Sequence, residues 1–279
     1  MRNAMTIDVE DYFQVSAFEQ HIAPESWDRL PCRVARNMDL ILAMLAESGV
    51  KATFFTLGWV AQRYPEQVRR IVAEGHELAS HGFNHRRAAD QSRSEFRQDV
   101  DSAKKLLEDI AGVAVLGYRA PSFSIGAANM WALDVLRETG HRYSSSIYPI
   151  VHDHYGMPDA PRFAHQPAAG NGLLELPATT IRAFNRNWPA SGGGYFRLLP
   201  YAVSRAMIGH INRRDRQPAI FYFHPWEVDP EQPVQQGIGF KSRFRHYVNL
   251  KRMEPRIRQL LRDFQWDRMD RIFLAEQAA

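Results

Sequence analysis

The chain has 279 residues, which suits one domain of α/β-barrel size or two smaller domains. Hydrophobic residues make up 45% and charged residues 24%, which excludes a disordered, collagen-like or coiled-coil protein. The formal net charge of +4 arises from 35 Lys and Arg against 31 Asp and Glu. That excess is too small to indicate a nucleic-acid partner. The single cysteine, Cys32, excludes a disulfide framework and a cysteine-based zinc site.

The first twenty residues lack the pattern of a secretion signal, since Asp8, Glu10, Asp11 and Glu19 interrupt what would have to be an apolar core. No segment approaches the roughly 18 to 20 apolar residues of a membrane span. We therefore expect no membrane span and a cytoplasmic protein, in a reducing compartment that suits one unpaired cysteine. The sequence is compatible with a homo-oligomer but does not determine the oligomeric state.

Short apolar runs alternate with amphipathic segments along the whole chain. Pro65 suits the first position of a helix, and Ser92 with Glu95 has the spacing of a capping box. In chain order we expect a strand at 5–9, helix 34–48, strand 52–57, helix 65–74, strand 76–80, helix 93–110, strand 113–119, helix 129–138, strands 142–147 and 173–176, helix 199–212, strand 219–223 and helix 245–264. Residues 150–172 and 188–196 are predicted as long loops. Repeated strand–helix units without a compositional break predict one α/β domain over residues 1–279, ending in a helical extension.

Candidate polar residues lie where predicted strands end. They are Asp8, Glu10 and Asp11 after the first strand, His81 after the third, Arg119 after the fourth and His224 after the run at 219–223. Active sites of parallel α/β barrels form at the carboxyl ends of the strands. These residues, scattered along the chain, are therefore expected to converge on one rim.

The pair His81 and His85 is the sharpest local feature. Two imidazoles four residues apart can reach one metal ion from a single turn. Because no cysteine is available nearby, the third ligand should be a carboxylate, which Asp8, Glu10 or Asp11 can supply. Two histidines, one carboxylate and an open position for water form a hydrolytic zinc arrangement. A chance pair among the 11 histidines is the alternative.

Each remaining candidate also has a plain structural interpretation. Arg119 taken alone is explained as well by a surface ion pair, and His224 by a histidine buried in the core. The segment 191–194 (SGGG) lacks the residues of a phosphate-binding loop, so we interpret it as a flexible loop.

As a set, several motifs resemble those of the NodB-homology polysaccharide deacetylases, carbohydrate esterase family four. They occur in family order and cover nearly the whole chain: 6–11 (TIDVED), 80–85 (SHGFNH), 118–123 (YRAPSF), 174–177 (LELP) and 221–225 (FYFHP). The beginning of the chain and the segment from Gly192 are similar, more narrowly, to deacetylases of exosortase and exopolysaccharide loci.

The resemblance implies a distorted (β/α)7 barrel that removes N-acetyl groups from amino sugars of an exopolysaccharide or related glycan and releases acetate. It further implies a divalent metal, with zinc the preferred ion. The implied roles are general base for Asp8, base-orienting residue for Arg119, general acid for His224, metal ligands for Glu10, His81 and His85, and substrate-groove residues for Pro121 and Phe123.

The chain departs from the family pattern in two places. Val9 stands where the usual first motif has its metal-binding Asp, so Glu10 matches an Asp-x-Asp branch, with Asp11 the less favoured substitute. The strand at 142–146 offers no carboxylate to pair with His224, which leaves the partner of that histidine open. Two other functions remain as alternatives: an amidohydrolase of cyclic imides or ureides, and a carbohydrate-binding barrel without catalysis.

Overall fold

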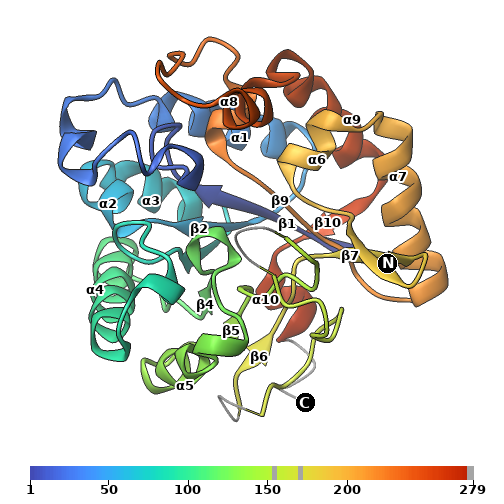
Figure 1. The fold of residues 1–279 in the computed structure, drawn as a ribbon, viewed down its shortest axis with the longest axis horizontal. Helices are drawn as coiled ribbons and strands as arrows, with labels where there is room; N and C mark the ends of the chain where they lie inside the picture. Colours follow the sequence, from blue (N-terminus) through green and yellow to red (C-terminus); the bar gives the residue numbers. More distant parts are fainter. Residues whose placement is uncertain (153–155, 169–171, 275–279) are drawn as a thin grey trace.

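A computed structural model describes residues 1–152, 156–168 and 172–274. Its centre is a parallel sheet of eight strands that curls into an open half-barrel (Figure 1). The strands of this sheet are β1 (Arg2–Val9), β2 (Thr53–Thr56), β3 (Glu77–Ser80), β4 (Gly117–Tyr118), β5 (Tyr143–Ser144), β6 (Leu174–Glu175), β9 (Ile220–Phe223) and β10 (Gln265–Asp267). A separate antiparallel hairpin consists of β7 (Thr180–Ala183) and β8 (Arg186–Pro189).

Helices cover the outside of the sheet (Figure 1). They are α1 (Val34–Glu47), α2 (Gly58–Arg63), α3 (Pro65–Ala73), α4 (Arg93–Ala111), α5 (Trp131–Glu138), α6 (Gly193–Leu198), α7 (Tyr201–His210), α8 (Phe240–Tyr247), α9 (Met253–Asp263) and α10 (Met269–Phe273). The expected capping box is present, with Ser92 and Glu95 bonding reciprocally at the start of α4. No helix in the described part of the chain is long and apolar enough to cross a membrane.

Strand β1 occupies the middle of the sheet and sets the position of the site. Its residues Thr6–Val9 pair with β2, and Ala4–Ile7 pair with β9 on the other edge. From β2 the sheet continues through β3, β4 and β5 to β6, and within the described ranges no strand pairing joins β6 to β9. The expected parallel α/β architecture is therefore confirmed, with the barrel open on one side. All of these strands direct their carboxyl ends to one rim.

The C-terminal region differs from the expected helical extension. Strand β10 adds beside residues Arg2–Ala4 of β1, so part of this region belongs to the sheet. The predicted helix over 245–264 is interrupted, because Val248 is extended and Asn249 adopts a left-handed φ of 54° between α8 and α9. Both neighbours are helical, and periodicity alone did not reveal the break.

Two further expectations were wrong in detail. The strand predicted over 113–119 contains only Gly117–Tyr118 in regular pairing. Residues 188–196, predicted as a loop, include the end of β8 and the start of α6, while the expected loop at 150–172 includes residues 153–155 and 169–171, which lie outside the described residues.

Candidate active site

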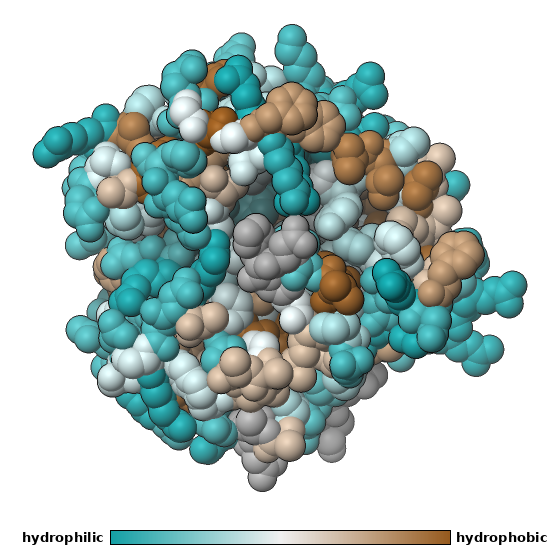
Figure 2. Space-filling model, viewed as in Figure 1, coloured by the Kyte–Doolittle hydropathy of each residue, from teal (hydrophilic) through white to brown (hydrophobic). Residues whose placement is uncertain are grey.

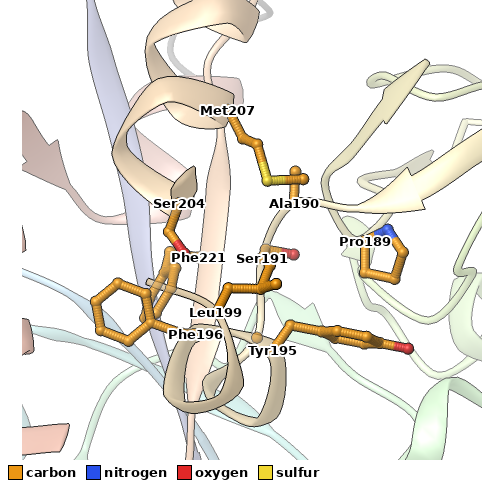
Figure 3. Close-up of a pocket in the computed structure, with 10 residues that line it drawn as sticks. Pro189, Ala190, Ser191, Tyr195, Phe196, Leu199, Ser204, Met207 and Phe221 are labelled. Carbon is orange, nitrogen blue, oxygen red and sulfur yellow. The ribbon is translucent and has the colours of Figure 1, made fainter. Parts of the chain in front are cut away.

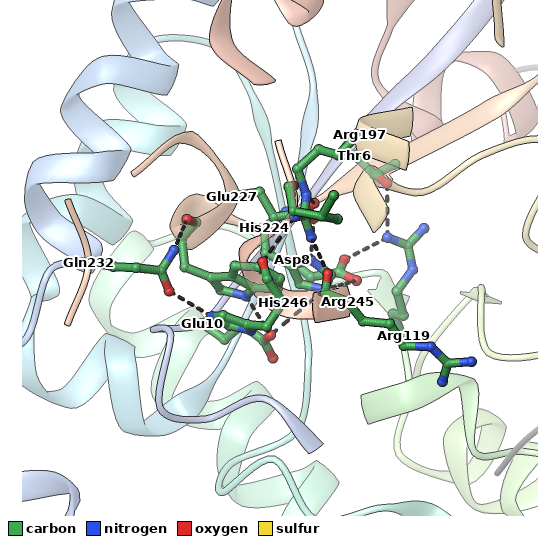
Figure 4. Close-up of polar contacts among 12 residues, drawn as sticks. Thr6, Asp8, Glu10, Arg119, Arg197, His224, Glu227, Gln232, Arg245 and His246 are labelled. Carbon is green, nitrogen blue, oxygen red and sulfur yellow. Dashed lines mark hydrogen bonds and ion pairs between the residues drawn. The ribbon is translucent and has the colours of Figure 1, made fainter. Parts of the chain in front are cut away.

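Residues distant in sequence meet at the carboxyl rim of the sheet. Asp8 and Glu10 lie at the end of β1, His81 follows β3, Arg119 follows β4 and His224 follows β9. Figure 2 shows a recess surrounded by hydrophilic side chains near the middle of this face of the molecule. The polar contacts among the rim residues, and to the elements behind them, are drawn in Figure 4.

Glu10, His81 and His85 form a compact triad. One potential ligand atom from each lies within 4.8 Å of the other two. The Oε2 atom of Glu10 is 2.7 Å from Nε2 of His85 and 4.0 Å from Nε2 of His81. All three side chains are at least nine-tenths buried. Two imidazole nitrogens and one carboxylate oxygen in this arrangement are a donor set suited to a divalent cation such as zinc.

Neighbouring groups hold the triad in the form that a metal requires. The Nδ1 atom of His81 lies 2.8 Å from the backbone oxygen of Arg119, which directs the protonated nitrogen there and leaves Nε2 free for a metal. Burial lowers the pKa of His81 to about 4, so its imidazole is neutral near pH 7. Trp226 donates its indole N–H to Oε1 of Glu10 at 3.2 Å and thereby orients the carboxylate.

The electrostatics of Glu10 reflect its histidine neighbours. Burial raises the pKa of its carboxyl, but the charges of His85, His224 and His81 outweigh burial and lower the pKa to about 2. Glu10 is therefore an anion across the physiological range, which is the ligand form of a carboxylate.

Asp11 lies next to Glu10 in sequence but has a different structural task. Its Oδ2 accepts the backbone N–H groups of Arg33 and Val34 at 2.6 and 2.9 Å, at the start of α1, and its Oδ1 accepts that of Tyr12 at 2.8 Å. A carboxylate at a helix N-terminus satisfies amides that have no partner within the helix. Asp11 is thus committed to the N-terminus of α1 and is absent from the triad.

Asp8 and Arg119 form a buried ion pair at the rim. Arg119 donates from Nη1 to Oδ1 of Asp8 at 2.6 Å and to the hydroxyl of Thr6 at 2.8 Å. Its other nitrogens donate to the backbone and side-chain oxygens of Ser145. With the guanidinium held on two sides, the Asp8 carboxylate has one fixed orientation, and its Oδ2 remains 3.9 Å from Nε2 of His224. The surface ion-pair interpretation of Arg119 is excluded, because its side chain is only 1% exposed.

His224 is held by a carboxylate that the sequence analysis missed. Its Nδ1 lies 2.7 Å from Oε1 of Glu227, and Glu227 in turn accepts from Nε of Arg197 at 2.8 Å (Figure 4). Burial lowers the pKa of His224, but Glu10, Glu227 and Asp8 together raise it to about 9. The imidazole is therefore protonated near neutral pH and can donate a proton from Nε2. The i,i+3 spacing of His224 and Glu227, with a proline between, is a helix N-terminal pattern that could have indicated this partner.

The glycine-rich segment supports this network and is not the flexible loop we expected. Gly193 begins α6, and a Cβ at this position would overlap the carboxylate of Glu227. Gly192 has a φ of 93° and passes against the ring of Tyr222 in the same way. The neighbouring pocket, lined by Ser191, Tyr195 and other residues shown in Figure 3, measures about 10 Å³, enough for a single water. The glycines thus allow close packing behind the site.

Pro121 and Phe123 lie beside the rim but are buried. They belong to a short 3-10 turn after β4 in which Phe123 has a left-handed φ of 49°. The ring of Phe123 packs against Tyr148 and Tyr222, with centroids 5.2 and 4.9 Å away. Contact between either residue and a substrate stays a prediction.

The fold and this site define a class of protein: a parallel α/β half-barrel whose strand ends present a two-histidine, one-carboxylate triad beside a base and an acid. Comparison with known families agrees, since residues 25–144 match the polysaccharide deacetylase family and residues 145–274 match DUF3473, a domain of unknown function. The chain belongs to the polysaccharide deacetylases of the NodB-homology type, carbohydrate esterase family four. The sheet draws strands from both matched regions.

Curated relatives carry related names. A chitooligosaccharide deacetylase of Azorhizobium caulinodans is 34% identical over 103 residues, which are 37% of this chain and 48% of that protein. A peptidoglycan-N-acetylglucosamine deacetylase of Bacillus cereus is 37% identical over 81 residues, 29% of this chain and 30% of that protein. The matched region thus spans less than half the length of either relative.

Solved structures show the same fold over nearly the full chain. A candidate polysaccharide deacetylase from Mycobacterium smegmatis aligns with a TM-score of 0.65 at 22% identity, covering 99% of this chain and 89% of that one. An allantoinase aligns with a TM-score of 0.62 at 17% identity, covering 99% and 90%. At these identities the likeness concerns the fold alone.

Proposed function

We propose that this protein is a metal-dependent hydrolase that removes N-acetyl groups from amino sugars of a glycan, such as an exopolysaccharide, and releases acetate. The observation that supports this most is the buried triad of Glu10, His81 and His85 with Asp8 and His224 beside it. Relatives named as deacetylases of chitooligosaccharides and peptidoglycan support the substrate class.

Each residue of the site has a separate chemical task in this proposal. Glu10, His81 and His85 would hold a divalent cation, zinc by preference, which supplies Lewis-acid activation of water and of the amide carbonyl. Asp8, oriented by Arg119, accepts the proton of the attacking water. His224, charged through its contact with Glu227, donates a proton to the departing amine nitrogen.

Metal analysis combined with an acetate-release assay on N-acetylated chitooligosaccharides tests the proposal. We expect about one zinc ion per chain and acetate release in proportion to enzyme. The double variant His81→Ala, His85→Ala should lose both the metal and the activity. A double variant that retains a full equivalent of metal would show that the site is elsewhere.

The same assays distinguish the two alternatives. Hydrolysis of a cyclic ureide without acetate release would favour the amidohydrolase, whose substrate class the fold likeness to an allantoinase leaves open. Glycan binding without bound metal or turnover would favour a non-catalytic barrel. Cytoplasmic localisation, a single domain over the whole chain and self-association stay predictions.

A further inference from the structure

A cavity of about 220 Å³ lies beside the triad, and His85 forms part of its wall. It lies between the segment that follows β1 and the loop that follows His85. Apolar side chains, among them Phe13 and Trp27, line it together with the polar side chains of Gln14 and Arg87. Because a cavity of roughly 10 to 15 Å³ already holds one water, this space is large enough for a group far bigger than water.

Three of the lining residues carry buried N–H donors that have no partner. They are Nε2 of Gln14, Nε1 of Trp27 and Nε of Arg87, and none of them finds an acceptor within the described ranges of the chain. Buried polar groups are nearly always hydrogen-bonded, so three unpartnered ones around one cavity need an explanation. All three are donors, which means that the missing partner must offer acceptor oxygens.

Other contacts hold each of these side chains in place. The Oε1 atom of Gln14 accepts the backbone N–H of Asp11 at 2.8 Å, which leaves the amide nitrogen as its unused end. Arg87 donates from Nη2 to Glu19 at 2.6 Å, so its guanidinium is anchored while Nε stays unpaired. The indole of Trp27 packs edge-on against Trp59, with ring centroids 5.6 Å apart. The donors are therefore positioned before any ligand arrives, which reduces the entropy lost on binding.

We infer that this cavity is a sugar-binding subsite, which takes the glycan residue next to the one whose N-acetyl group faces the triad. The inference rests on the proposed function, because it takes the triad as the reaction centre. A pyranose ring has apolar C–H faces that pack on Phe13 and Trp27, and its oxygens can accept from the three donors. The shared wall at His85 joins the subsite to the triad and makes it specific for a chain of sugars over a single sugar.

Calorimetric titration with N-acetylglucosamine and with its β-1,4-linked pentamer tests the subsite. Trp27→Phe keeps an aromatic ring but removes the N–H, and Gln14→Glu keeps the acceptor for Asp11 but replaces the donor. We expect each variant to bind the pentamer about 3- to 10-fold more weakly, as the loss of one hydrogen bond predicts, and to bind the single sugar like the wild type. Trp59→Phe is the matched control, since the same change falls on a residue outside the cavity lining and should leave both affinities unchanged.

Binding is measured independently of turnover, so the two proposals can fail separately. Pentamer affinity that depends on Trp27 and Gln14 in a protein that releases no acetate would support the subsite and contradict the deacetylase. Acetate release with pentamer affinity unchanged in both variants, or a wild type that binds pentamer no better than the single sugar, would overturn the subsite. Circular dichroism and thermal melting confirm that each variant is folded.

Discussion

Nδ1 of His224 lies 2.7 Å from Oε1 of Glu227, three residues further along the same turn. The family pattern provides this partner as an Asp from another strand, and the corresponding strand here has no carboxylate. The turn that carries His224 therefore supplies its own counter-ion, and Arg197 from α6 holds that carboxylate from the other side. A charged histidine, a carboxylate and an arginine form one chain of contacts.

Replacing Glu227 by Gln should shift the pH dependence of turnover. The carboxylate stabilises the imidazolium, so its removal lowers the pKa of His224 from its raised value of about 9. Because the acid must be protonated, activity falls as pH rises through this pKa, and in Glu227→Gln the fall should begin about one to two pH units lower. The pH profile of kcat on an N-acetylated oligosaccharide measures this. An unchanged basic limb would mean that Glu227 does not set the charge of His224.

Replacing Arg197 by Leu should destabilise the fold. Arg197 and Glu227 are both about 1% exposed, so the variant leaves a buried carboxylate without its cation. Removal of one partner of a buried pair costs roughly 3 to 5 kcal/mol of unfolding free energy. Urea unfolding tests this, with Arg69→Leu as control, because the exposed pair of Arg69 and Glu66 should contribute less than about 1 kcal/mol. Equal losses in the two variants would contradict the assignment.

The two adjacent acids, Glu10 and Asp11, should behave differently when truncated. Glu10→Ala removes a member of the triad and should abolish metal binding. Asp11→Ala should retain most of the metal but lose roughly 0.5 to 2 kcal/mol of stability, because the N-terminus of α1 loses its acceptor. Metal content and urea midpoints of the two variants separate these outcomes, and metal loss only in Asp11→Ala would move the ligand to that residue.

Asp8→Asn should retain the metal and lose turnover. The amide keeps the shape of the side chain but cannot take a proton, so we expect a loss of about 10²- to 10⁴-fold in kcat. An activated ester needs little protonation of its leaving group, so it should be affected as strongly as the amide in Asp8→Asn but partly escape the defect of His224→Ala. If His224→Ala impairs ester and amide equally, its role as the acid is wrong.

The buried carboxyl of Glu77, at the start of β3, should make stability depend on pH. Burial, and then the charge of Asp270, raise its pKa from 4.5 to about 7. The folded state therefore holds a proton that the unfolded state has released, and this contribution is complete below about pH 4.5 and lost as pH rises through 7. The stability of the wild type relative to Glu77→Gln should fall between pH 5 and about 8 in urea titrations. A difference that is constant with pH would contradict the raised pKa.

The sequence by itself determined the alternation of strands and helices and the position of Asp8, His81, Arg119 and His224 at strand ends. These features follow from local periodicity, and parallel strands bring their carboxyl ends to one rim regardless of how far apart they lie in the chain. The His81 and His85 pair was visible for the same reason, because one turn determines its geometry.

Only the tertiary structure decided which of two adjacent acids joins the triad, what holds His224, and where the chain ends in the sheet. Glu10 and Asp11 differ in the direction of their side chains just beyond β1, and the N-terminus of α1, more than twenty residues away, claims Asp11. The pairing of β10 with β1 joins residues more than 260 positions apart, which no local pattern specifies. Side-chain direction at a strand end and contacts between distant segments depend on the packing of the whole chain, so spacing alone could not reveal them.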